Sequence, residues 1–174
     1  MKDGEATGAD EIVGWPKAHF AEHKRRYPDF DGPTVRAILA LRITAQRVEN
    51  ALGAWFLGDG LTPQKFGVLI VLAAEKDPIT LSDLRRSLGT TQANVTGLVA
   101  GLERSGLLER RTSREDRRVS YVSLSRSGRR LVEARSPQFF ARVREGMRGL
   151  SQAEKKTFVE LLTKIVRGYE QLDD

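Results

Sequence analysis

The sequence contains no cysteine and only two histidines among its 174 residues. Without cysteine, the chain cannot form a disulfide, a thiol redox sensor or a cysteine-ligated zinc site. His19 and His23 stand four residues apart, a spacing that places both on one face of a helix. No cysteine or third histidine is available to complete a metal site with them. We therefore expect the two histidines to be surface residues and the protein to hold no metal.

Long apolar runs are also missing. No stretch reaches the roughly 18 consecutive apolar residues that a membrane-spanning helix needs. The first ten residues are small and acidic, so we expect them to be disordered. They also contain no apolar core of the kind that a signal peptide needs. These features predict a soluble cytoplasmic protein with no membrane partner.

Catalytic signatures are absent as well. The sequence has no Walker loop and no Gly-x-Gly-x-x-Gly after a strand. The lack of cysteine and the two clustered histidines argue against serine or cysteine triads. Carboxylates such as Asp29 and Asp31 lie in a cluster of turn residues between Pro28 and Pro33, which favours solvation over acid–base chemistry. We predict that the protein is not an enzyme and uses no cofactor.

The chain does contain a local cluster of arginines. It carries 29 basic and 23 acidic residues, for a net charge of +6, which is compatible with nucleic-acid binding without requiring it. The location of the arginines says more than the total, because six of them fall within fifteen residues. These are Arg104, Arg110, Arg111, Arg114, Arg117 and Arg118.

Before this cluster, the sequence predicts two short helices joined by a tight turn. Thr80 is suited to cap a helix over 81–88, and Gly89 is suited to end it. Thr90 or Thr91 then caps a second helix that runs to about residue 104. That helix has a single apolar stripe, formed by Val95, Leu98, Val99 and Leu102. Two helices with a glycine-containing turn between them are typical of a helix-turn-helix.

The other face of the second helix is small and polar. Asparagine and glutamine side chains can pair bidentately with adenine, and small neighbours allow the backbone to come close to DNA. The alternative is an ordinary solvated helix face. The residues that we predict to face DNA on this helix are Thr91, Gln92, Asn94 and Thr96.

Two strands, at 107–111 and 119–124, should follow the helices and enclose the arginine-rich segment as a hairpin. Arginines in such a hairpin suit phosphate contact and insertion into the minor groove. Asp116 can orient a neighbouring arginine by a charge-assisted hydrogen bond. The alternative is an ordinary exposed hairpin. The remaining predicted DNA-binding residues are Arg85, Arg86, Arg114, Asp116, Arg117 and Arg118.

The stretch from Ile79 to Ser125 closely resembles the MarR (multiple-antibiotic-resistance) family of bacterial transcriptional regulators, and the order of elements matches the family from about Thr34 to Gln171. The most specific match is the hairpin signature Asp-x-Arg, five residues, then Leu-Thr. Here it reads Asp116, Arg117 and Arg118, five residues, then Leu124 and Ser125, with serine in place of the usual threonine. We interpret this replacement as neutral, because either hydroxyl can cap the next helix. The segments 94–99 and 102–107 resemble the recognition helix and its exit.

Helices are predicted on both sides of the winged helix. A helix from Glu11 to about Tyr27 should carry Trp15, with Pro16 in its first turn. Long helices should cover about 34–57 and 63–75 before the winged helix, and helices after it should run from 126 towards 150 and from Ser151 onwards. Pro137 is expected to kink or interrupt the first of these, and Ser151 with Glu154 to form a capping box.

The fold class that follows is mainly α (α+β), a winged helix-turn-helix with a two-stranded wing and terminal dimerisation helices. The predicted parts are an N-terminal extension, a dimerisation helix, the DNA-binding domain and the C-terminal dimerisation helices, at residues 1–33, 34–57, 58–125 and 126–174. The terminal helices carry more apolar surface than a small winged helix needs. The resemblance implies that they interlock two subunits in a homodimer, and the alternative is that they pack on their own domain.

The resemblance also implies a cleft for a small anionic or aromatic effector. The residues that would line it are Trp15, Phe20, Arg42, Phe66, Ile70 and Arg110. The alternative is that most of them are core residues. Trp15 in an N-terminal extension is similar to the urate-responsive branch of the family. That branch uses an aspartate and an arginine where this chain has Gly67 and Thr96 or Gly97, which argues against urate.

We therefore predict a regulator whose expected partners are double-stranded DNA, a second copy of the chain and a small-molecule effector. Its expected role is that of a repressor that binds a pseudo-palindromic operator and is released by the effector. The alternative is a winged-helix module for protein interaction or architectural DNA binding without an effector.

Overall fold

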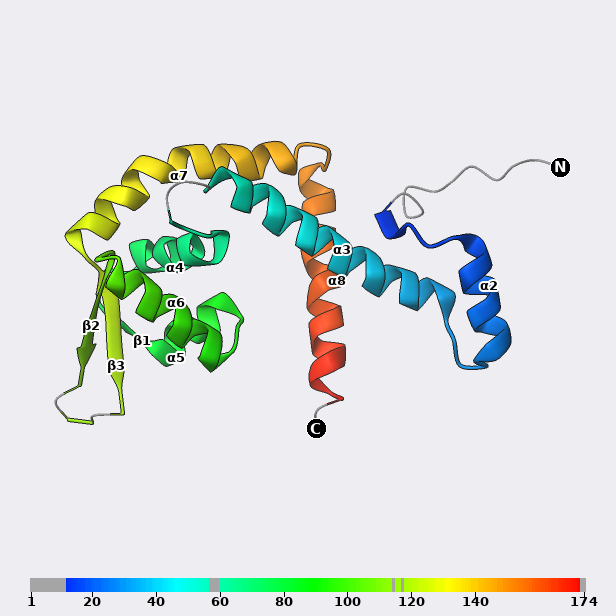
Figure 1. Ribbon diagram of the computed structural model, residues 1–174, viewed down its shortest axis with the longest axis horizontal. Helices are drawn as coiled ribbons and strands as arrows, with labels where there is room; N and C mark the ends of the chain where they lie inside the picture. Colours follow the sequence, from blue (N-terminus) through cyan, green and yellow to red (C-terminus); the bar gives the residue numbers. More distant parts are fainter. Residues whose placement is uncertain (1–11, 57–59, 114, 117, 173–174) are drawn as a thin grey trace. The chain divides into compact units, whose positions relative to one another are not determined.

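In the computed structural model, the described residues are 12–56, 60–113, 115–116 and 118–172. Their contacts divide the chain into two units, Met1–Gly67 and Val68–Asp174. Figure 1 shows the helices and strands in chain order. The predicted disordered start, residues 1–10, lies outside the described residues.

In the first unit, the helix that was expected from Glu11 to Tyr27 is shorter than predicted. Gly14 adopts a left-handed φ of +64°, which interrupts the helical path. Helix α2 therefore begins later than predicted and spans Lys17–Arg26. Pro16 precedes the helix as its N-cap residue and does not lie in the first turn as predicted.

The long helix α3 spans Gly32–Trp55, close to the predicted 34–57. Its end packs in an aromatic cluster, in which the ring of Phe56 lies 4.6 Å from that of Trp55 and 5.2 Å from that of Phe66. No residue of α3 is buried within the single chain. The predicted end of the helix at residue 57, and most of the glycine break after it, lie outside the described residues.

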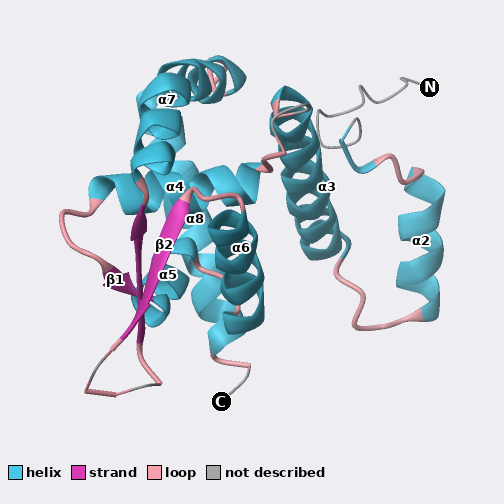
Figure 2. Cartoon of the chain, turned by 60° about the vertical axis from the view of Figure 1, so that its left-hand side comes forward, coloured by secondary structure: helices cyan, strands magenta, loops and turns pink. Residues whose placement is uncertain are grey.

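Helix α4, Pro63–Ala74, continues from the first unit into the second. The second unit then contains β1 (Ile79–Thr80), α5 (Leu81–Leu88), α6 (Gln92–Arg104), β2 (Leu108–Thr112) and β3 (Ser120–Leu124). Figure 2 shows the strands, which form an antiparallel sheet in the order β1-β3-β2. The predicted wing is the β2–β3 hairpin, and β1 was not predicted.

The apolar stripe of α6 forms the core of this winged helix. Val95, Val99 and Leu102 are fully buried, as are Leu84 of α5 and Val122 of β3. Helices α5 and α6 pack on each other and on the sheet. The stripe predicted from the sequence is therefore confirmed, with Leu98 half-buried at its edge.

The predicted start and end of α5 and the predicted start of α6 are confirmed. The Thr80 hydroxyl accepts a hydrogen bond from the N–H of Asp83 at 3.1 Å, and the Thr91 hydroxyl accepts one from the N–H of Asn94 at 3.3 Å. Gly89 has a φ of 58° at the end of α5. A non-glycine residue would be strained at this turn. The turn thus sets the angle at which α6 leaves α5.

After the wing, α7 runs over Arg126–Gly146 and α8 over Gln152–Glu170. Helix α7 continues through Pro137, so the residue does not interrupt it; Figure 1 shows the helix curving along its length. The capping box of Ser151 and Glu154 is present at the start of α8. None of the helices in the described part of the chain is long and apolar enough to cross a bilayer.

The start of α7 is held against the root of the wing. The N–H of Ser125 donates to the carbonyl of Leu107 at 3.1 Å, and its hydroxyl donates to the carbonyl of Gly106 at 2.7 Å. Gly128 is buried beside the same Leu107 carbonyl, where an added β-carbon would overlap the oxygen. The wing and α7 are therefore joined through main-chain atoms.

Candidate nucleic-acid interface

One face of α6 is exposed and consists of small and polar side chains. Its core-facing residues are fully buried, whereas the residues predicted to face DNA are open to solvent. Because the exposed side chains are small, the backbone of this helix can come close to the bases in a groove of DNA. The exposed residues at its start are Thr91, Gln92, Ala93, Asn94, Thr96 and Gly97.

Local hydrogen bonds hold some of these side chains in place. The amide nitrogen of Asn94 donates to the Thr90 hydroxyl at 2.8 Å, which fixes the orientation of the amide. Its carbonyl oxygen and second amide hydrogen are left for another partner. The Thr96 hydroxyl donates to the carbonyl of Gln92 at 2.8 Å, so its oxygen is free to accept.

Helix α5 adds two exposed arginines with different surroundings. Arg86 pairs with Asp83 at 3.1 Å, whereas Arg85 has no ion-pair partner among the residues that the structure describes. The Thr80 hydroxyl, which donates to the Asp83 carboxylate at 2.7 Å, lowers the pKa of that carboxyl, and nearby Arg86 adds to the effect. Of the two, Arg85 is the more available to a phosphate.

The turn of the wing is shaped by side chains that bond the main chain. Asp116 Oδ1 accepts from the N–H of Arg118 at 2.9 Å, and Ser113 Oγ accepts from the N–H groups of Glu115 and Asp116. We predicted that Asp116 would bond the guanidinium of a neighbouring arginine. In the structure, Asp116 instead accepts a hydrogen bond from the main chain of Arg118. Arg114 and Arg117, also predicted here, lie outside the described residues.

The arginines of β2 are tied to their neighbours. Arg110 donates from Nη2 to the Ser120 hydroxyl at 3.1 Å, across the hairpin. Arg111 pairs with Glu109 at 3.3 Å. These bonds stabilise the strands of the wing. Arg118, which lies just before β3, is also exposed, and its side chain makes no hydrogen bond or ion pair with the described residues.

A polar hollow of about 330 Å³ lies between the start of α5, the start of α6 and the wing. Two of the predicted DNA-binding residues, Gln92 and Arg118, are among its lining residues, although 26 positions separate them in the sequence. Ser82 also lines it and was not predicted. The pairing of β1 with β3 brings these segments together, and β1 is too short to give a sequence signal. The full lining is Thr80, Leu81, Ser82, Gln92, Arg118, Val119 and Ser120.

Comparison with known proteins decides the family. The family model described as "MarR family" matches residues 59–119. The HTH-type transcriptional repressor YetL of Bacillus subtilis is 30% identical to this chain over 154 residues, which are 87% of this chain and 92% of YetL. The chain belongs to the MarR family.

Solved MarR-family structures agree with this assignment. The DNA complex of MepR from S. aureus is 25% identical and has a TM-score of 0.67, covering 74% of this chain and 94% of MepR. BpsR of Bordetella bronchiseptica is 28% identical with a TM-score of 0.62, covering 72% of this chain and 95% of BpsR. The protein is thus a winged-helix DNA-binding transcriptional regulator, and it is not an enzyme.

The residues predicted to line a MarR-type effector cleft are found in both units. In the first unit, Trp15 and Phe20 are neighbours with ring centroids 5.4 Å apart, and the guanidinium of Arg36 lies over the Phe20 ring at 4.4 Å. Phe66 is fully buried in the aromatic cluster, whereas Arg42 is exposed on α3. In the second unit, Ile70 is half-buried on α4 and Arg110 bonds Ser120.

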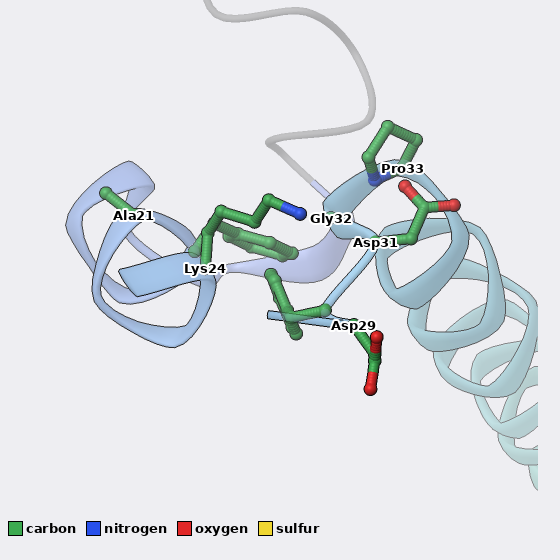
Figure 3. A pocket seen from close by; sticks show the side chains of 8 residues that line it. Ala21, Lys24, Asp29, Asp31, Gly32 and Pro33 are labelled. Atoms are coloured by element: carbon green, nitrogen blue, oxygen red, sulfur yellow. The ribbon is translucent and has the colours of Figure 1, made fainter. Parts of the chain in front are cut away.

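Phe20 also borders a hollow of about 550 Å³ within the first unit. Figure 3 shows Lys24, Asp29 and Asp31 around it. Lys24 is held by a bond from its Nζ to the carbonyl of Pro28 at 3.1 Å. Trp15 is not one of the lining residues, so this hollow differs from the predicted cleft.

The two histidines lie in the same aromatic region. His23 Nδ1 is 2.7 Å from the carbonyl oxygen of His19, and its ring is 5.7 Å from that of Trp15. Among the residues that the structure describes, no group of three potential metal ligands comes together. His19 is exposed and His23 is half-buried, and both rings lie beside that of Trp15.

Proposed function

We propose that this MarR-family regulator binds a pseudo-palindromic operator as a homodimer and acts in the cytoplasm as a ligand-released repressor. The observation that carries the dimer is the uncovered apolar face of α8. None of its residues is buried in the single chain. Phe158, Leu161, Val166 and Tyr169 are 41%, 51%, 55% and 55% exposed. A contiguous apolar face of this kind favours a protein partner.

A two-fold protein also explains how a 13-residue recognition helix gains affinity. Two copies can read half-sites about one helical turn apart, roughly 10 base pairs from centre to centre. The similar MepR has been solved in complex with DNA, which supports DNA binding by this chain. Light scattering at micromolar concentration tests the dimer, and a species of only 19.4 kDa would exclude it.

Within each half-site, we assign base reading to Asn94 and Thr96, on the exposed face of α6. From the sequence alone, we predicted base reading by Gln92 as well. Replacing Asn94 with alanine should cost about 1–3 kcal/mol on the cognate operator and little on random DNA. Equal losses on both would show that Asn94 positions the protein without reading a base.

For the effector, we propose a small anionic aromatic compound. The DNA binding of the similar BpsR is regulated by 6-hydroxynicotinic acid, a compound of this class. The physical support in this chain is that the winged helix is continuous with α4 and α7, so movement of these helices changes the spacing of two recognition helices. A tenfold preference for the DNA-incompetent spacing is about 1.4 kcal/mol per site, or about a hundredfold in operator affinity for two sites.

A thermal-shift screen of aromatic acids and acyl-CoA esters, followed by operator binding with each stabilising compound, tests the switch. An effector should lower operator affinity. If every stabilising compound leaves the affinity unchanged, these compounds do not bind at an effector site and the proposed switch is wrong. Repression itself is tested by a reporter gene placed behind the operator.

A further inference from the structure

The polar hollow between α5, α6 and the wing contains two kinds of polar groups. The first kind is already paired inside the protein. The Thr80 hydroxyl donates to Asp83 Oδ2 and accepts from the N–H of Asp83. The Ser120 hydroxyl, on a residue only 8% exposed, accepts from Arg110. The Thr80 and Ser120 hydroxyls therefore already have hydrogen-bond partners inside the protein.

The second kind belongs to three exposed residues that line the hollow, which are Ser82 of α5, Gln92 of α6 and Arg118 of the wing. Each of their side chains carries a hydrogen-bond donor. Within the described part of the chain, none of these three side chains makes a hydrogen bond or ion pair. They come from three elements and border the same hollow.

The charge of the hollow is positive. Among the described residues that line it, Arg118 is the charged one, and no carboxylate is present. The nearest carboxylate in sequence, Asp83, is committed to Thr80 and Arg86. Several donors, one of them a guanidinium, match an acceptor-only anion, and a guanidinium can bind a phosphate through two parallel hydrogen bonds.

We propose that this hollow holds one phosphate of the DNA backbone, with Ser82, Gln92 and Arg118 as its ligands. The proposal rests on the proposed operator binding and adds residue roles to it. Gln92 fixes the register of α6 on the duplex and does not read a base. Ser82 is a DNA ligand. Because the three ligands come from both helices and the wing, a single phosphate ties the recognition helix and the wing to the same strand.

Single substitutions test the three ligands. Ser82→Ala, Gln92→Ala and Arg118→Gln should each weaken binding by up to about tenfold, since a hydrogen bond to a charged group is lost. The losses should be equal on the operator and on a shuffled duplex, because a phosphate carries no sequence. Ser87→Ala, on the same helix, and Arg104→Gln, at the far end of α6, are matched controls outside the hollow and should have no effect.

Methylphosphonate replacement of single phosphates in the operator identifies the ligand itself. At one position in each half-site, the replacement should weaken binding of the wild type but cost nothing further in Ser82→Ala or Arg118→Gln; replacements at the other contacted phosphates should weaken all three proteins alike. If the wild type binds the operator and no position couples to these variants, the assignment of the hollow is wrong while the proposed function stands. A Gln92→Ala loss confined to the operator would instead make Gln92 a base reader. A wild type that binds no duplex at all would overturn both.

Discussion

The α-carbon of Gly128 lies against the main chain of Leu107. An added β-carbon would stand 3.1 Å from the Leu107 carbonyl carbon and closer still to its oxygen. Both atoms belong to the backbone, so no side chain can rotate away to make room. The position therefore requires glycine for space, although it lies in a helix, where glycine is otherwise unfavourable.

Gly128→Ala should destabilise the protein by about 1–3 kcal/mol, the usual range for overpacking. Urea unfolding measures the loss. Gly146→Ala, at the end of the same helix, is the control, because its β-carbon would meet nothing within 4 Å. A Gly128 variant as stable as the control would show that the wing root adjusts easily.

Asp83 predicts a dependence of stability on pH. Its pKa is lowered, first by the Thr80 hydroxyl and then by Arg86. A carboxyl with a lowered folded-state pKa stabilises the protein above its unfolded pKa, near 4, and this contribution is lost as the pH falls through the folded-state pKa. The urea midpoint should fall between pH 6 and pH 3, and less steeply in Asp83→Asn. Parallel profiles for the two proteins would contradict this role of Asp83.

At the level of elements, Ser125 joins the wing to α7. Its hydroxyl accepts from the N–H of Gly128 at 3.0 Å and donates to the carbonyl of Gly106. Ser125→Ala should cost about 1 kcal/mol or more, since it removes a helix cap and leaves a carbonyl unpaired. Ser125→Thr should retain the stability, as expected from the threonine usual in the family. Thermal unfolding of both variants decides whether the replacement is neutral.

The sequence predicted those elements whose ends carry their own signals. Thr80, Thr91 and Ser151 are caps with local hydrogen bonds, and α5, α6 and α8 begin where these residues predict. Two features depended on more than a local signal. Strand β1 has two residues and exists only through pairing with β3, and α2 begins late because Gly14 takes a left-handed conformation.

The candidate site was predicted as two separate groups of residues, one on the helix and one on the wing. Side-chain type and helical spacing were sufficient for the exposed residues of α6. They could not show that Gln92 and Arg118 border the same hollow, or that Ser82 lies beside them, because tertiary pairing sets that proximity. Nor could they show that Asp116 bonds the main chain of Arg118.

On the scale of the whole molecule, the exposed face of α8 predicts the oligomeric state. Leu161→Glu should convert the dimer to a monomer and abolish operator binding at nanomolar protein, because a charge would be buried in an apolar interface. Sedimentation and operator binding measure the two effects. Lys156→Glu makes a charge change on the same helix, at an exposed polar position, and should leave the dimer intact. A dimeric Leu161→Glu variant would place the interface elsewhere.

The number of phosphates bound by the whole dimer is a further prediction. If it neutralises about six, log K should fall with log salt at a slope of about −5. Arg118→Gln should reduce the steepness by about two, since each dimer would lose two phosphate contacts. Fluorescence anisotropy with operator DNA between about 50 and 200 mM salt gives both slopes. A nearly flat response of the wild type would exclude a contribution of the wing.

The joint at the root of the wing uses the carbonyl groups of Gly106 and Leu107. Main-chain carbonyls are the same in every protein, so the joint places no demand on the side chains of the hairpin beyond it. The outer part of the wing is therefore portable. Exchanging residues 111–119 for those of a relative should transfer that relative's wing contacts without repair of the joint. Evolution has the same freedom, and the contacts that the wing makes with DNA can change while the rest of the chain stays as it is.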